Sequence, residues 1–334
     1  MPSLPKPRLR RGRGGELISP QPEPERQPNV QTIAGEGFRW INIERPSPLE
    51  AAWLEEQFDF HALDLEDVLS RNQRPKIDEY DAYLFIVLHF PVFDRAVGRL
   101  NAGELDIFAG QDFLVTLPNQ PLQPVSYLFE RCRAREELRH QLFSRGSGYL
   151  LYRIVDDSFD YCFPMLRKIG NKLDALEDEI FEGRGQDVVR DLSNVKQEII
   201  NFRKVTRPQR TVLRDLENAK QPFLAPAGGE LEIYFDDIAD SHERIWDMLE
   251  NYKEVVEGLE DTNESVISHR LNDVLRVLTV ISVVFLPLTL IASIWGMNSH
   301  VPGQGTTIGF WAVIAVMLGV LGGMVYFFRR RGWL

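Results

Sequence analysis

The longest apolar segments of the chain lie near its C-terminal end. Residues 274–295 carry Arg276 as their single charge, and residues 308–328 carry none. A helix of about 20 mostly apolar residues is long enough to cross the hydrocarbon core of a bilayer. The pattern therefore predicts two transmembrane helices, joined by an outer loop over residues 296–307.

The first of these helices also has a polar side. Hydroxyl, amide and small side chains recur at a period of 3.5 residues, which a helix surrounded only by lipid would not need. Identical helices in a ring would turn this side toward a shared axis, where it could line a water-filled path. The alternative is that Ser and Thr only pack helices together, as they often do in membranes. The polar stripe comprises Ser265, Ser268, Asn272, Leu275, Thr279, Ser282, Leu286, Thr289 and Ser293.

Upstream of the spans the pattern is that of a water-soluble protein. Residues 38–145 alternate short apolar runs of strand type with helical spacing, which predicts a cytoplasmic α/β domain. Within this domain Ser47, with Glu50 three residues later, predicts a capped helix start. Residues 146–229 keep helical spacing and predict a cytoplasmic helical hairpin.

The last soluble segment runs into the first span without a helix-breaking signal. Residues 230–273 are therefore expected to form the acidic stalk of one long helix that continues to residue 295. A helix of this length is usually a coiled coil or crosses two phases. The expected fold class is an α+β cytoplasmic domain followed by long helices and a two-span C-terminal transmembrane helical hairpin.

Charge sets the orientation of the spans. The chain has 334 residues and a net charge of −11, yet residues 1–37 form a basic tail rich in Pro, Arg and Gly that is expected to be disordered. Residues 329–334 are also basic. Because basic flanks stay on the cytoplasmic side, both termini are expected in the cytoplasm of a multi-pass protein of the cell (inner or plasma) membrane. No nucleic-acid partner is expected.

The stalk itself is strongly acidic. Between Glu230 and Glu264 there are thirteen acidic residues against Arg244 and Lys253. Gaps of three and four place many of them on one side of the helix, which most often means a solvated face. Like charges in this arrangement repel, and bound divalent cations would relieve the repulsion.

The first span ends at Gly296, Met297 and Asn298. Gly permits non-helical backbone, and Asn298 offers a carboxamide oxygen where the helix ends. Neutral oxygens suit a cation that keeps its water, and Mg²⁺ dehydrates reluctantly. No phosphate-binding loop or catalytic constellation stands out, so no enzyme activity is expected.

Three segments resemble the CorA family of divalent metal-ion transporters, which has a ZntB-like branch and a GMN motif. They are YFDDIADSHERIWDMLENYKEVVEGLEDTNESVISHRLNDVLRVLTVISVVFLPLTLIASIWGMN, LEDVLSRNQRPKIDEYDAYLFIVLHF and the C-terminal FFRRRGWL. The resemblance implies a funnel-shaped homopentamer whose first span lines a pore for Mg²⁺, with Co²⁺ or Ni²⁺ as further ions. It also implies inward transport that closes when cytoplasmic Mg²⁺ binds between subunits.

The resemblance also implies roles for single positions. Gly296, Met297 and Asn298 match the selectivity motif, and Asp261 matches an acidic ring at the inner pore. Asp237 matches a carboxylate that binds regulatory Mg²⁺, and Asp94 is the partner we assign to it. The pore-lining positions, taken from the family and from the stripe, with the leucines as the apolar gate, are Asp261, Asn272, Leu275, Leu278, Thr279, Ser282, Leu286, Thr289 and Ser293.

Two departures from the family pattern leave the ion open. The outer loop lacks the acidic residue that many magnesium-type members carry after the motif and has His300 instead, and Trp295 stands where Tyr or Phe is usual. A ZntB-like Zn²⁺ transporter is therefore the alternative. A non-conducting, membrane-anchored metal sensor or scaffold is a second alternative, but such a protein has no use for the polar stripe.

Overall fold

The structure is a computed structural model that describes residues 27–70, 73–94, 98–182, 185–218, 222–224, 231–297 and 306–333. The chain divides into two compact units. The first is drawn from Met1–Lys168 and Glu198–Glu250, and the second from Ile169–Gln197 and Asn251–Leu334. Three long helices contribute residues to both units.

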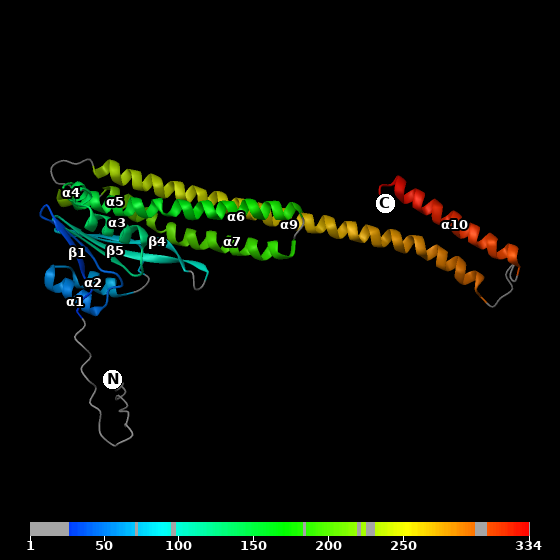
Figure 1. Cartoon of the computed structure of the whole chain (residues 1–334), viewed down its shortest axis with the longest axis horizontal. Helices are drawn as coiled ribbons and strands as arrows, with labels where there is room; N and C mark the ends of the chain where they lie inside the picture. Colours follow the sequence, from blue (N-terminus) through cyan, green and yellow to red (C-terminus); the bar gives the residue numbers. More distant parts are fainter. Residues whose placement is uncertain are drawn as a thin grey trace, which may run out of the picture. The chain divides into compact units, whose positions relative to one another are not determined.

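A six-stranded sheet forms the centre of the first unit (Figure 1). Its strand order is β1-β2-β6-β5-β4-β3, and every neighbouring pair is antiparallel except β2 and β6, which run parallel. The long β4–β5 pair is in register from Tyr83 opposite Gly110 to Asp94 opposite Arg99. The strands are β1 (Gln31–Gly35), β2 (Phe38–Asn42), β3 (Lys76–Glu79), β4 (Tyr83–Asp94), β5 (Arg99–Gly110) and β6 (Phe113–Pro118).

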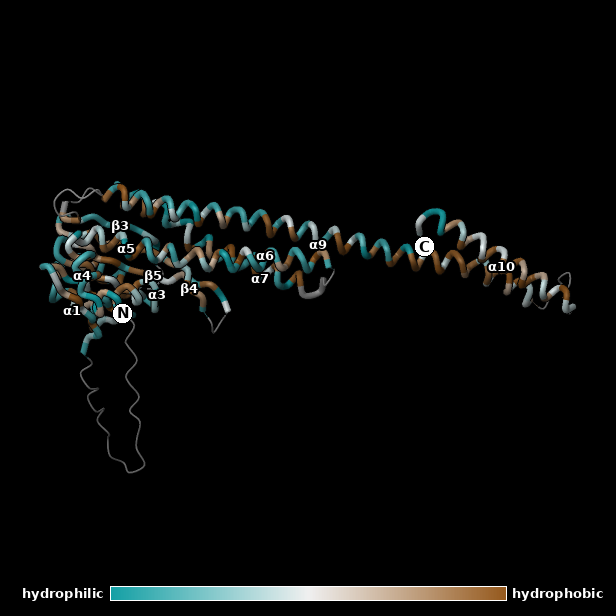
Figure 2. Tube along the Cα trace, turned by 45° about the horizontal axis from the view of Figure 1, so that its top comes forward, coloured by the Kyte–Doolittle hydropathy of each residue, from teal (hydrophilic) through white to brown (hydrophobic). Residues whose placement is uncertain are grey.

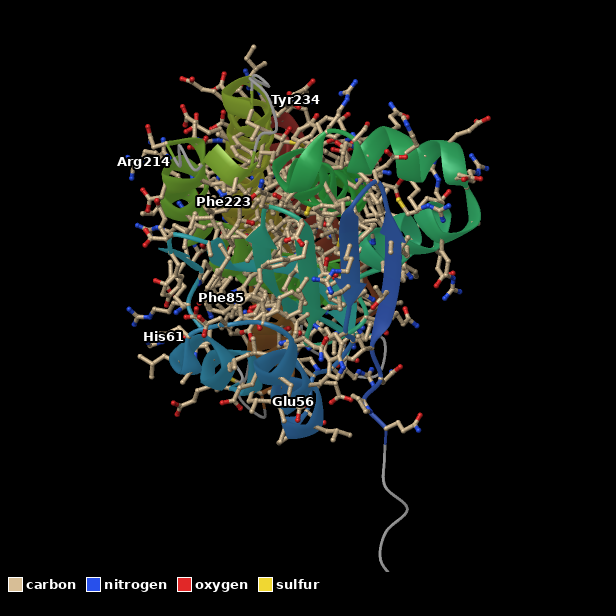
Figure 3. The ribbon with its side chains drawn as sticks, turned by 90° about the vertical axis from the view of Figure 1, so that its left-hand side faces the viewer. Glu56, His61, Phe85, Arg214, Phe223 and Tyr234 are labelled. Atoms are coloured by element: carbon tan, nitrogen blue, oxygen red, sulfur yellow. The ribbon has the colours of Figure 1, made fainter. Side chains whose placement is uncertain are left out.

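Helices cover both faces of this sheet (Figure 1). One face packs against α1 (Pro48–Gln57) and α2 (Ala62–Leu69), where the ring of Phe60 stacks on Phe108 at 4.0 Å. Figure 3 shows Phe85 between the sheet and the layer that carries Glu56 and His61. The other face packs against α3 (Gln123–Ala134) and α5 (Gly146–Asp160), with α4 (Glu136–Phe143) beside them. The predicted Ser47–Glu50 capping box at the start of α1 is confirmed.

The predicted tail is wrong in its last residues. Gln31–Gly35 were assigned to the disordered tail but form the edge strand β1, paired antiparallel with β2. Glu36 and Gly37 make the turn between them with positive φ angles of 56° and 74°. The strand gains its order from pairing with β2 and from the burial of Ile33, neither of which its polar composition reveals. Residues 1–26 of the predicted tail lie outside the described residues.

The helical part of the chain follows α5. Its elements are α6 (Cys162–Glu182), α7 (Gly185–Thr206), α8 (Gln209–Asn218) and a short 3₁₀ turn, η1 (Pro222–Leu224). Pro164 lies in the first turn of α6, where a missing N–H is tolerated. In the second unit α6 packs closely on the long helix α9 (Leu231–Trp295). A Cβ at Gly170 would lie 2.8 Å from the Tyr252 hydroxyl, so a larger residue there would require the Tyr252 side chain to shift.

Helix α9 (Leu231–Trp295) is a single helix of 65 residues, which confirms the predicted continuity of stalk and span. It is followed by α10 (Thr307–Arg330), and both helices are long and apolar enough to cross a membrane. Figure 2 shows that hydrophobic residues gather in the last part of α9 and along α10, while the first part of α9 is mostly hydrophilic. The apolar portions therefore coincide with the two predicted spans.

Candidate functional site

Helices α9 and α10 pack together through one side of α9. Val280 and Val284 are buried against Phe328, with Leu288, Leu321 and Met324 packed around them. At about 100° per residue, Val280, Val284 and Leu288 occupy an arc of about 80°. The polar stripe from Leu275 to Ser293 is centred on the opposite side of the helix, about 180° away. Helix α10 therefore leaves the stripe uncovered, and Leu286 in its middle is 74% exposed in the single chain.

Three hydroxyl groups on this stripe donate their hydrogen to a backbone carbonyl of the same helix. Thr279 Oγ1 donates to the carbonyl oxygen of Leu275 at 2.7 Å, and Ser282 Oγ donates to that of Leu278 at 2.9 Å. Thr289 Oγ1 donates to the Phe285 carbonyl oxygen at 2.8 Å in the same way. Because each hydroxyl proton is engaged within the helix, the oxygen presents only lone pairs to the surroundings. The stripe can thus accept hydrogen bonds from water, and water bound to a cation points its hydrogens outward.

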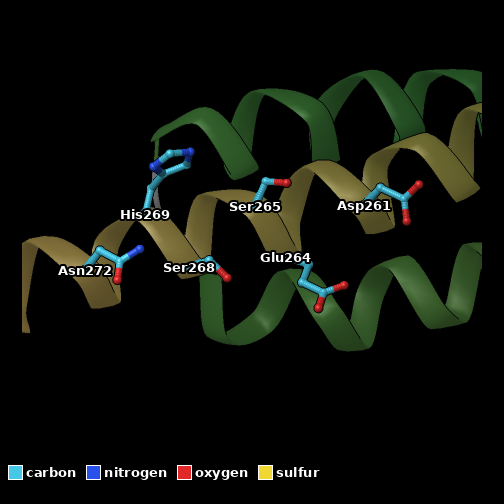
Figure 4. A pocket seen from close by; sticks show the side chains of 6 residues that line it. All are labelled: Asp261, Glu264, Ser265, Ser268, His269 and Asn272. Atoms are coloured by element: carbon cyan, nitrogen blue, oxygen red, sulfur yellow. The ribbon is translucent and has the colours of Figure 1, made fainter.

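A shallow pocket lies along α9 just before the span (Figure 4). Its volume is about 390 Å³, and all the residues that line it belong to α9. Two of these residues, Asp261 and Asn272, were predicted from the family resemblance, whereas Glu264 and His269 were not. Their positions three and four residues from Asp261 and Ser265 are the signal that could have identified them. The lining residues are Asp261, Glu264, Ser265, Ser268, His269 and Asn272.

The far end of the span carries two of the three predicted selectivity residues. Gly296 continues the last turn of α9, its N–H donating to the Ala292 carbonyl oxygen at 2.9 Å. A Cβ at this position would come within 3.1 Å of that oxygen, which favours Gly. Met297 is 55% exposed. Asn298 and His300 lie outside the described residues, so their roles stay predictions.

The acidic stalk is partly neutralised by basic residues of the same chain. Lys196 of α7 pairs with Glu260 at 2.6 Å, and Arg210 of α8 pairs with Glu243 at 2.7 Å. Arg203 of α7 pairs with Glu250, and its guanidinium also lies 5.1 Å from the Trp246 ring. The repulsion inferred from the sequence is therefore smaller than the acidic residues alone indicate.

A second line of acidic residues on α9 has no such neutralisation. Its members recur at two-turn intervals, are all exposed and make no ion pair within the described part of the chain. They are Asp240, Asp247, Glu254 and Asp261. The charge of these four carboxylates is therefore not balanced by an ion pair within the described residues.

The predicted regulatory residue Asp237 lies in a cluster that the sequence did not reveal. The Tyr152 hydroxyl of α5 donates to Asp237 Oδ2 at 3.1 Å. Burial raises the pKa of Asp156 to about 6; Arg153 opposes this shift, while the carboxylates of Asp160, Asp157 and Asp237 add to it. The cluster thus combines closely spaced carboxylates, one of which is partly protonated near neutral pH.

Asp94, the predicted partner of Asp237, lies at the end of β4, where Asn101 Nδ2 is 3.5 Å from its Oδ2. The described partner of Asp237 within one chain is Tyr152, so a pairing with Asp94 of another subunit stays a prediction. Among the described residues no three Asp, Glu, His or Cys side chains are arranged to hold a metal ion.

Comparison with known proteins places these features in context. The family model described as CorA-like Mg²⁺ transporter protein matches residues 35–330. The chain is 31% identical over 298 residues to the cobalt/magnesium transport protein CorA of Thermotoga maritima, with 88% of this chain and 83% of that protein covered.

Solved structures share the fold. The complete CorA magnesium transporter of Methanocaldococcus jannaschii matches with a TM-score of 0.77 at 24% identity, over 90% of this chain and 94% of that chain. The ZntB cytoplasmic domain of Vibrio parahaemolyticus matches with a TM-score of 0.58 at 16% identity, over 70% and 88%. The fold is therefore shared by proteins with different names, and by itself it does not select an ion.

Proposed function

Since this chain belongs to the CorA-like family of Mg²⁺ transporter proteins, we propose that it conducts hydrated divalent cations, chiefly Mg²⁺, into the cell. Co²⁺ and Ni²⁺ are secondary ions. The observation that carries the proposal is the polar stripe of α9, which faces away from α10 and on which the hydroxyls of Thr279, Ser282 and Thr289 donate within the helix and leave their oxygens to accept hydrogen bonds. A helix pair embedded in lipid has no partner for such a stripe, whereas a ring of subunits does.

The assembly we propose is a funnel-shaped homopentamer in the cell membrane with both termini in the cytoplasm. Gly296, Met297 and Asn298 form its outer mouth, and Leu275, Leu278 and Leu286 form an apolar gate. Hydroxyl oxygens between the leucines accept hydrogen bonds from the water shell of the ion. The full set of pore residues is Asp261, Asn272, Leu275, Leu278, Thr279, Ser282, Leu286, Thr289 and Ser293.

The membrane potential drives the ion. A divalent cation moving inward gains about 4.6 kcal/mol per 100 mV of inside-negative potential, at about 2.3 kcal/mol per charge. Closure follows when cytoplasmic Mg²⁺ binds at Asp237 and along the unpaired carboxylates of the stalk. When the internal Mg²⁺ falls, these carboxylates repel, the subunits separate and the leucine constriction opens.

Ion flux into liposomes tests the proposal. The purified full chain is reconstituted with indicators for Mg²⁺ and Zn²⁺, and we expect Mg²⁺ entry that is faster than Zn²⁺ entry. Thr289→Val removes one acceptor without changing the side-chain shape and should slow flux, while Thr289→Ser keeps the oxygen and should not. Faster Zn²⁺ entry would favour the ZntB-like alternative, and no flux of either ion from folded protein would favour a sensor or scaffold.

A further inference from the structure

The C-terminal residues after α10 fold back instead of continuing the helix. Gly332 has a φ of +68°, the left-handed conformation that commonly ends a helix. The Trp333 N–H then donates to the Phe328 carbonyl oxygen at 3.0 Å, and the two rings stack at 5.7 Å. The C-terminal hook, residues 331–333, is therefore held in place by backbone and ring contacts.

The hook brings Trp333 against the beginning of the first span. Phe328 is buried against Val280 and Val284, so the last turn of α10 lies level with the first turns of the α9 span. Arg276 is one turn before Val280, and its guanidinium carbon lies 5.9 Å from the Trp333 ring. Arg276 at the start of the first span and Trp333 after the second span therefore lie side by side, at the same level along the helix pair.

Among the described residues, none accepts a hydrogen bond from the Arg276 guanidinium. A guanidinium carries five N–H groups, and the one ion pair of Arg276 within the described part of the chain is with Asp273 at 3.6 Å. That distance is too long for a hydrogen bond. The side chain is 45% exposed. An arginine at the edge of an apolar span reaches toward the interface because burial in hydrocarbon is costly.

The residues around Arg276 are mostly basic. The ring of Trp333 beside it is of a type that favours the membrane–water interface. Arg329, Arg330 and Arg331 are exposed and follow Phe328 directly. Within the described residues, the ion pair formed by this basic cluster is the one between Arg276 and Asp273. Trp residues favour the headgroup level of a bilayer, and the planar fork of Arg fits a phosphate with two hydrogen bonds. Basic pockets between membrane helices bind anionic lipid headgroups for this reason.

We propose that the ends of α9 and α10 and the C-terminal hook form a binding site for the phosphate of an anionic phospholipid, centred on Arg276 and Trp333. The guanidinium of Arg276 binds the phosphate, the indole of Trp333 holds the guanidinium in place, and the exposed arginines attract the negative headgroup. The site requires that the two helices span a bilayer, as in the proposed function, but it does not require that the chain conducts ions.

Lipid retention by the full chain tests this site. The purified protein in detergent is given phosphatidylglycerol, phosphatidylcholine of the same acyl chains, or inorganic phosphate, and bound lipid is counted by native mass spectrometry. We expect phosphatidylglycerol to be retained over phosphatidylcholine. Arg276→Gln should weaken its retention about fivefold, the factor that corresponds to about 1 kcal/mol per basic residue at an anionic surface. Arg190→Gln, an exposed arginine of α7, is the control and should change nothing.

Three results would overturn the proposal. Equal retention of phosphatidylglycerol and phosphatidylcholine would show that the site does not distinguish the headgroup charge. Complete displacement of the lipid by inorganic phosphate would indicate a general anion site. Unchanged lipid retention in Arg276→Gln would show that Arg276 does not bind the phosphate. If that variant does not fold, Trp333→Leu replaces it, since this change leaves α9 intact and should also weaken retention. Ion flux is measured separately, in liposomes of phosphatidylcholine alone, so that a failure of the lipid site is distinguished from a failure of conduction.

Discussion

The hydroxyl of Tyr152 donates a hydrogen bond to Asp237 Oδ2 at 3.1 Å and thereby ties α5 to the first part of α9. Burial, together with the carboxylates of Asp156 and Asp237, raises the pKa of Tyr152 to about 12, so the hydroxyl remains a donor at physiological pH. One carboxylate oxygen of Asp237 is thus engaged within the chain. An ion that binds Asp237 has to share this carboxylate with Tyr152.

Removing this hydrogen bond should therefore strengthen regulation by Mg²⁺. We expect flux through Tyr152→Phe to be inhibited at an internal Mg²⁺ concentration about tenfold lower, because a hydrogen bond to a charged group contributes about 1.5 kcal/mol. Asp237→Asn should have the opposite effect and abolish inhibition. Flux into liposomes at graded internal Mg²⁺ measures both. Tyr149→Phe, in the same aromatic cluster, is the matched control, and an equal shift in it would contradict the prediction.

Regulation should also depend on pH through Asp156. The pKa of this carboxyl is raised by burial to about 6, so in the folded chain it keeps its proton up to a higher pH than a free carboxyl does. A cation needs the ionised form, and its binding at the cluster should strengthen as pH rises through about 6. Measuring the half-inhibitory Mg²⁺ concentration on both sides of that pH tests this. Asp156→Asn should flatten the dependence, and an unchanged slope in that variant would exclude Asp156 as its origin.

The sheet contains a buried acid whose replacement should stabilise the protein. Asp106 is 1% exposed, and its Oδ1 has no hydrogen-bond partner among the described residues. Burial, and then the neighbouring Glu104, raises its pKa well above the usual value of 3.8. Because the folded pKa lies above the unfolded one, the stability that this group contributes is complete below the unfolded pKa and is lost as pH rises toward the folded pKa.

Asp106→Asn does not titrate, so its advantage should grow with pH. We expect unfolding free energies close to wild type near pH 4 and a gain of about 1–3 kcal/mol at neutral pH. Thermal unfolding of the full chain across this pH range measures the difference. Asp112→Asn alters an exposed carboxylate in the β5–β6 turn and should show no such trend. A gain in Asp106→Asn that is the same at every pH would argue against titration as the cause.

The charge pairs of the stalk should compete with divalent cations. Arg203→Gln leaves Glu250 without its partner, and we expect a loss of about 1 kcal/mol in stability that is smaller at high salt. The freed carboxylate should let Mg²⁺ stabilise this variant more than it stabilises wild type. Melting temperatures with and without Mg²⁺ measure both effects. The Arg210–Glu243 pair is more exposed, so Arg210→Gln should show a smaller loss, and a larger one would contradict this ranking.

Sequence by itself determined the parts of this protein that depend on neighbours along the chain. The lengths of the two apolar runs, the period of the polar stripe and the capping box at Ser47 and Glu50 are all local patterns. A helix makes its hydrogen bonds within one segment, so its length and its faces can be derived from that segment alone. For this reason the continuous helix α9 was correctly predicted, while the role of its polar side as a pore lining stays a prediction.

Tertiary structure alone decided the contacts between distant segments. The strand β1 was missed because the backbone hydrogen bonds of a strand go to another segment. The residues of β1 therefore do not show by themselves that it pairs with β2. The hydrogen bond from Tyr152 to Asp237, the basic residues that neutralise the stalk and the contact of Arg276 with Trp333 were missed for the same reason. Each joins side chains far apart in sequence, which come together only when the helices have packed.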